Sequence, residues 1–105
     1  MAKMKETARK NAIEVLEQNI IAAAYHYSII GGYIMTLPTI GDDKMTFDVF
    51  EPSSNMDYVI TVNLKTGDYW DSEDLYDTDY PIQIRKALQY FHDEYDESSV
   101  PDNFE

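Results

Sequence analysis

The chain has 105 residues, a net charge of −12, no cysteine, and 44% hydrophobic residues. A domain of this length buries about 60–68% of its unfolded surface without a metal or a disulfide. The hydrophobic content argues against global disorder, and the absence of cysteine excludes a disulfide framework, a cysteine-ligated zinc site and a thiol nucleophile.

The charge is distributed unevenly along the chain. Residues 1–40 carry four basic and three acidic side chains, whereas residues 41–105 carry four basic and seventeen acidic ones. The first part is therefore near +1 and the second part near −13. An acidic surplus of this size repels itself in the folded state, so we expect its negative field to attract a positively charged surface.

Apolar residues at helical spacing predict a first helix from about Thr7 to Ile30. Its apolar face contains Ile13, Leu16, Ile20, Ala23 or Ala24, and Tyr27. Gly31 and Gly32 predict the end of this helix, and residues 33–37 favour a short extended piece before Pro38. Further apolar residues, Val15, Ile21, Ala22 and Ile29, widen this surface. Such width is typical of a buried central helix or of a homodimer interface.

Alternating apolar residues predict two antiparallel strands, at residues 44–51 and 58–64, joined by a polar turn at residues 52–55. Gly67 can adopt a positive φ, so the chain should reverse after the second strand. We expect it to continue as a short third strand through Tyr69 and Trp70.

A second helix is predicted after Pro81, with Thr78 or Asp79 near its cap. Its apolar face contains Ile84, Leu88, Phe91 and Tyr95. We expect this helix to end near Asp96 or Glu97, and residues 98–105 to form a frayed tail.

These elements predict a single α+β domain over residues 1–105, with the element order α-β-β-β-α. The three strands form an antiparallel meander, and both helices pack on its one apolar face. Double-stranded-RNA-binding domains share this element order, but the acidic charge and the absence of a basic loop argue against an RNA ligand. That family is therefore not assigned.

Two acidic clusters are the main candidates for a functional site. The first has six carboxylates between Asp68 and Asp79 without an intervening Lys or Arg, and the second lies at the end of the second helix. A helix dipole disfavours negative charge at that end. Tyrosine and tryptophan, which interleave with the first cluster, are typical interface anchors. The predicted partner-binding residues are Asp68, Asp71, Glu73, Asp74, Tyr76, Asp77, Asp79, Tyr80, Asp93, Glu94, Asp96 and Glu97.

We expect these clusters to join into one face that imitates the phosphates of a nucleic acid. Four other acidic residues would extend the face: Asp42, Asp43, Asp48 and Glu51. The alternative is an ordinary solvated surface, which is what most acidic clusters are.

Other chemistry receives little support from the sequence, so we expect no enzyme, cofactor or metal. A calcium-binding EF-hand loop beginning at Asp71 would need glycine at its sixth position, where Tyr76 stands. His92 is next to Asp93, but neighbouring helical residues point in different directions and do not form a catalytic dyad. The basic N-terminus is interrupted by acids and lacks the apolar stretch of a signal peptide or membrane span.

The short, acidic, aromatic-rich composition resembles that of phage-encoded antagonists such as anti-CRISPR and anti-restriction proteins. This resemblance implies a cytoplasmic, non-enzymatic inhibitor that mimics DNA and occupies the positively charged surface of a nuclease or other nucleic-acid-binding protein. The partner is then a basic protein rather than a nucleic acid or a membrane. Two alternatives stay open: an immunity protein against a nuclease toxin, and a structural or regulatory adaptor that binds through the first helix.

Overall fold

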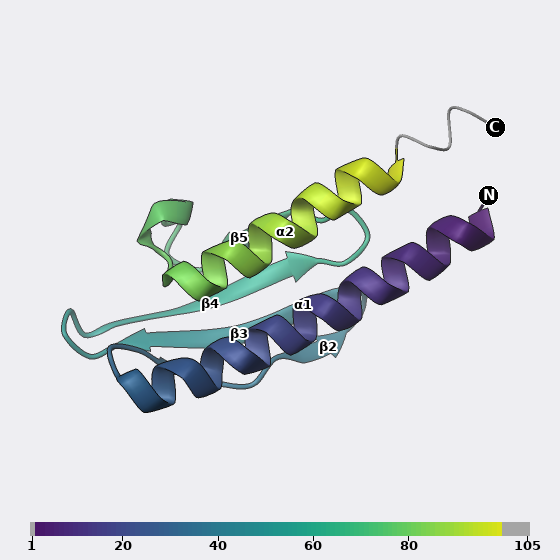
Figure 1. The fold of residues 1–105 in the computed structure, drawn as a ribbon. Helices are drawn as coiled ribbons and strands as arrows, with labels where there is room; N and C mark the ends of the chain where they lie inside the picture. The colour runs from purple at the N-terminus through teal and green to yellow at the C-terminus, as the bar shows by residue number, and fades with distance from the viewer. Residues whose placement is uncertain (1, 100–105) are drawn as a thin grey trace.

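Two helices lie side by side over one face of a β-sheet (Figure 1). The computed structural model describes residues 2–99, and it describes side chains for residues 8–94. Helix α1 spans Ala2–Ile30, and helix α2 spans Ile82–Ser99. The beginning of α1 and the end of α2 lie at the same end of the molecule, so the two helices run antiparallel.

The sheet is built around one long hairpin. Strands β3 (Lys44–Glu51) and β4 (Met56–Asn63) pair antiparallel along their whole length, and β5 (Tyr69–Asp71) continues the sheet beyond β4. On the other side of β3 lie two short strands, β1 (Ile34–Met35) and β2 (Thr39–Gly41), which both pair with β3. A 3₁₀ turn, η1 (Asp77–Asp79), precedes α2.

The predicted α+β class is confirmed, and the predicted meander corresponds to β3, β4 and β5. The extended piece predicted at residues 33–37 contains β1, which joins the sheet. The structure adds β2, so the sheet has five strands in the described part of the chain. Helix α1 begins before the predicted Thr7, and α2 continues to Ser99, beyond the predicted end. The remainder of the predicted tail, residues 100–105, lies outside the described residues.

A tight turn explains the additional strand β2. Asp42 and Asp43 have φ angles of 54° and 60° and separate β2 from β3. Positive φ at both central residues of a two-residue loop matches the twist of paired strands. The chain before β3 therefore folds back on it, with Ile40 opposite Met45.

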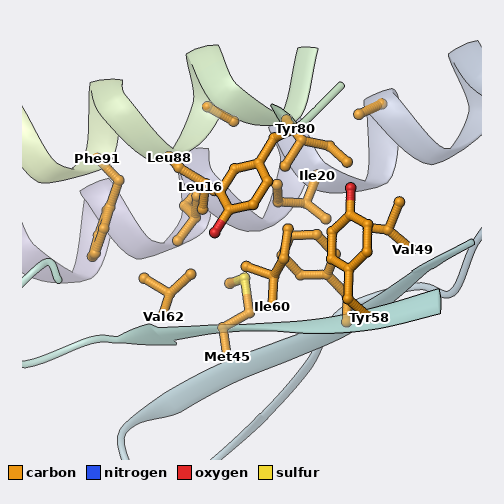
Figure 2. Close-up of a cluster of buried hydrophobic side chains, with 14 of the residues drawn as sticks. Leu16, Ile20, Met45, Val49, Tyr58, Ile60, Val62, Tyr80, Leu88 and Phe91 are labelled. Carbon is orange, nitrogen blue, oxygen red and sulfur yellow. The ribbon is translucent and has the colours of Figure 1, made fainter. Parts of the chain in front are cut away.

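The core lies between the helices and the covered face of the sheet (Figure 2). Every second residue of β3 lies opposite a buried residue of β4: Met45 is opposite Val62, and Phe47 is opposite Ile60. Side chains on one side of a strand share a face, so these pairs point together toward the helices. Both helices complete the core with apolar stripes: Leu16, Ile20, Ala23 and Tyr27 from α1, and Ile84, Ala87, Leu88 and Phe91 from α2.

The opposite face of the sheet has no covering helix in the described part of the chain (Figure 1). Trp70 is 45% exposed there, and the Lys44 amine lies 5.9 Å from the centre of its ring. None of the described helices combines the length and the apolarity that crossing a lipid bilayer requires.

Candidate acidic interface

The first acidic cluster starts in the turn between β4 and β5. The Asn63 side-chain oxygen accepts hydrogen bonds from the backbone amides of Lys65 and Thr66, at 2.8 and 3.2 Å. Gly67 then takes a φ of 81°, which reverses the chain. The Asp68 carbonyl accepts a hydrogen bond from the Asn63 amide at 2.8 Å, so the turn holds Asp68 at the start of β5.

Asp71 organises the segment that follows β5. Its carboxylate accepts hydrogen bonds from the backbone amides of Glu73 and Leu75, at 2.8 and 3.1 Å, and from the Tyr80 hydroxyl. Burial and the Asp71 carboxylate raise the pKa of Tyr80 above its ordinary value. Asp71 is only 8% exposed and Tyr80 5%.

The sequence predicts that Asp71 and Tyr80 contact a partner, but both side chains are buried. Both side chains are occupied with each other and with the loop backbone, so they shape the surface without facing a partner. The Asp-Ser-Glu sequence at residues 71–73 is a signal for such a side-chain-to-backbone turn, which could have revealed this role.

Two further carboxylates make internal contacts, Asp77 from a partly buried position and Asp79 from an exposed one. Asp77 accepts a hydrogen bond from the Tyr69 hydroxyl, and Asp79 accepts one from the Tyr76 amide at 3.1 Å. The first bond holds η1 against β5, and the second closes the N-terminal end of η1. The Tyr76 ring is 81% exposed, so it is available for contact.

Helix α2 brings part of the second cluster to the first. The His92 Nδ1 atom lies 3.1 Å from the Gly67 carbonyl oxygen and 4.0 Å from the Asp68 carboxylate. The Tyr69 ring meets the His92 ring edge-on, with 6.2 Å between centroids. Burial, the hydrogen bond to Asp77, and the charges of Asp77 and Asp93 raise the pKa of Tyr69. Asp68, Asp77 and Asp93 therefore gather around Tyr69 and His92.

We call the exposed part of this surface the acidic edge: Asp68, Glu73, Asp74, Tyr76, Asp79 and Asp93. It runs along β5, over residues 72–79, and onto the adjacent side of α2. Asp68 is close to His92, whereas Glu73, Asp74 and Asp93 form no ion pair with any residue that the structure describes. The negative charge of the edge is therefore largely uncompensated by local cations.

Other acidic residues lie elsewhere. Glu94 accepts a hydrogen bond from the Tyr90 hydroxyl at 3.1 Å and faces α1, on the other side of α2. Asp43 lies 3.3 Å from the Lys65 amine, which offsets its charge. Asp48 pairs with Val59 on the open face of the sheet. The side chains of Asp96 and Glu97, also predicted to bind a partner, lie outside the described ones.

Two hollows lie between the helices, away from the acidic edge. One of about 320 Å³ is lined by Asn19, Ala22, Ala23, Gln83, Lys86, Ala87 and Tyr90. A second of about 250 Å³ is lined by Ala8, Asn11, Ala12, Val15, Tyr90 and Glu94. Among the described residues, no three His, Cys, Asp or Glu side chains converge to hold a metal ion.

The described part of the chain is thus a small acidic α+β domain with an acidic edge and an interhelical groove that contains two hollows. Comparison with protein families, with curated proteins and with solved structures gives no match.

Proposed function

We propose that this protein is a non-enzymatic inhibitor that binds the positively charged surface of a nucleic-acid-binding protein through the acidic edge. The observation that carries the proposal is the gathering of carboxylates from the β4–β5 turn, the 72–79 segment and α2 around Tyr69 and His92. Separate acidic stretches of the sequence contribute to one surface. Long-range attraction speeds the encounter, and bound carboxylates occupy the arginines and lysines that would hold phosphates.

The geometry of the edge also supports a rigid binding surface. Asp71, Asp77 and Asp79 fix the 72–79 backbone through hydrogen bonds. A partner would therefore meet carboxylates and the Tyr76 ring already in place, which lowers the entropy lost on binding. An immunity protein against a nuclease toxin would use the same surface, and the identity of the captured partner distinguishes the two.

Matched neutral variants test this proposal. One variant combines Asp68→Asn, Glu73→Gln, Asp74→Asn and Asp93→Asn within the edge, and leaves the structural carboxylates intact. A control combines Glu14→Gln, Asp42→Asn, Asp48→Asn and Asp57→Asn, which removes the same charge elsewhere. Each chain is immobilised and offered purified DNA- and RNA-binding nucleases, and binding is measured over a salt series with duplex DNA as competitor.

We expect the edge variant to lose at least about tenfold in affinity, the control to change less than about threefold, and added salt to weaken binding steeply. Duplex DNA should compete with the protein for the nuclease. Equal losses in both variants would mean that only total charge matters. Binding that resists salt and edge neutralisation would exclude the acidic edge as the binding surface.

An adaptor that binds through α1 is the second candidate, because one face of that helix is exposed and uncharged. Such binding would respond to substitutions on α1 and little to salt.

A further inference from the structure

Helix α1 carries two uncharged stripes on different faces. The first is buried in the core, and the second faces solvent. The second stripe, here called the outer seam, consists of Ala8, Asn11, Val15, Gln18, Ala22, Tyr25 and Ile29, all of which are exposed. Its members are spaced alternately by three and four residues, which is the spacing of a helix-to-helix contact.

The outer seam is unusual in so acidic a chain. There is no Asp, Glu, Lys or Arg between Gln18 and Gly41. Ile29 is 83% exposed, Tyr25 61% and Val15 40%. Exposed apolar residues that follow one helix face, rather than being scattered singly, indicate an interaction surface.

We propose that the outer seam joins two copies of this chain through antiparallel packing of their α1 helices. The proposal is independent of the inhibitor function. Two copies with a net charge of −12 each repel one another. A stripe without charged residues is therefore the surface along which they can approach with the least electrostatic cost.

The order of side chains along the seam favours the antiparallel arrangement. Gln18 is the middle member, so a two-fold axis at Gln18 places each small residue opposite a large one. Ile29 then faces Ala8 of the second copy, Tyr25 faces Asn11, and Val15 faces Ala22. A parallel arrangement would instead place Tyr25 against Tyr25 and leave the alanines facing one another.

The interhelical groove supplies a matching recess. The cavity of about 250 Å³ lies beside the seam, between Ala8, Asn11, Ala12 and Val15 of α1 and Tyr90 and Glu94 of α2. The antiparallel register places Tyr25 of the second copy next to Asn11, at this cavity. That volume accommodates an aromatic side chain, so Tyr25 can insert as a knob into a hole. The recess and the ring that fills it come from opposite ends of the same seam, as a two-fold interface requires.

The size of the seam sets the expected strength of the dimer. From Ala8 to Ile29 the helix rises about 32 Å. With flanking side chains, the interface buries on the order of 1,000 Å² in total, which is the low end for specific complexes. The dimer should therefore dissociate on dilution into the micromolar range.

Sedimentation equilibrium of the full chain, from about 1 to 500 µM, tests the proposal. We expect a monomer–dimer equilibrium that tightens as salt screens the repulsion, opposite in sign to binding through the acidic edge. Tyr25→Lys and Ile29→Lys should each weaken dimerisation at least about tenfold, because they place a desolvated charge in the seam. Tyr76→Lys, at an exposed ring outside the seam, is the control and should leave it unchanged.

Because the chain has no cysteine, single cysteines report the register. Gln18→Cys should form a disulfide-linked dimer on oxidation, whereas Ala22→Cys should remain unlinked. Efficient linking through Ala22→Cys would overturn the antiparallel packing. A chain that stays monomeric at every concentration would overturn the proposal, as would a dimer that tolerates both lysine substitutions while circular dichroism shows an intact fold.

Discussion

Replacing Asp71 tests whether one buried carboxylate holds the acidic edge together. This side chain receives two backbone amides and the Tyr80 hydroxyl, and it is only 8% exposed. Hydrogen bonds to a charged group each contribute about 1.5–3 kcal/mol. In Asp71→Ala, water can reach the two amides of the exposed loop, but the buried hydroxyl loses its partner. We expect a loss of about 3–5 kcal/mol in the free energy of unfolding, which is a large share of about 5–15 kcal/mol for a typical domain.

Two further variants separate the contributions. Asp71→Asn keeps one oxygen for the amides, and Tyr80→Phe removes only the hydroxyl, so each should cost about 1–2 kcal/mol. The double variant should cost less than the sum, because both changes remove the same contact. Asp93→Ala, an exposed carboxylate without an ion pair to a described residue, is the control and should stay within about 0.5 kcal/mol.

Urea denaturation followed by circular dichroism and by Trp70 fluorescence measures these values. Trp70 is the only tryptophan and is the neighbour of Asp71 in β5, so its emission also reports loosening of that strand. A loss below about 1 kcal/mol for Asp71→Ala would refute the reasoning, because it would mean that the loop holds its shape without this carboxylate.

Two other predictions concern tyrosines and glycines. Burial raises the pKa of Tyr58 and of Tyr80 above the ordinary tyrosine value of about 10. Above about pH 10 the unfolded state therefore loses protons that the folded state keeps. The free energy of unfolding should therefore be insensitive to these two tyrosines below about pH 9 and fall above about pH 10, by up to about 2.7 kcal/mol per pH unit for both together. Urea denaturation across this pH range measures the change, and a free energy of unfolding that stays constant to about pH 11 would contradict the prediction. Gly31 has a φ of 84° in open space, so Gly31→Ala should cost about 1–2 kcal/mol through backbone strain alone. Gly41 is equally open but has no positive φ, so Gly41→Ala should cost less than about 0.5 kcal/mol, and equal melting-temperature losses would disprove the strain argument.

The periodic parts of the chain could be predicted because one face of each element is buried. The alternation in residues 44–51 and 58–64 matches the register of β3 against β4, and the stripes of both helices match the core. Strand β2 could not be predicted in the same way. Its turn contains Asp42 and Asp43, whereas the recognisable two-residue hairpin turns contain glycine, and its three residues are too few to show a period.

The candidate site was harder to predict because charge in the sequence does not reveal how each carboxylate is used. Asp71 and Asp74 both belong to the same acidic run, yet Asp71 is buried and Asp74 is exposed. Which one turns inward depends on the return of the chain toward Tyr80, a contact nine residues away. The association of α2 with the β4–β5 turn through His92 likewise depends on tertiary packing, which no local pattern encodes.

Binding through the acidic edge and dimerisation through the outer seam should respond to salt in opposite directions, so the two proposals can be tested separately in one protein. The edge lies along β5 and the adjacent side of α2, whereas the seam lies on α1, so a dimer formed through α1 leaves the carboxylates of both copies open to solvent. Salt should weaken the edge's attraction for a basic partner and strengthen the seam's self-association. If both proposals are correct, the dimer presents two acidic edges. A partner with two basic surfaces would then bind the dimer more tightly than it binds the monomeric Tyr25→Lys variant, because the first contact raises the effective concentration for the second. A partner with one basic surface would bind both forms equally, so the comparison also reports the geometry of the target.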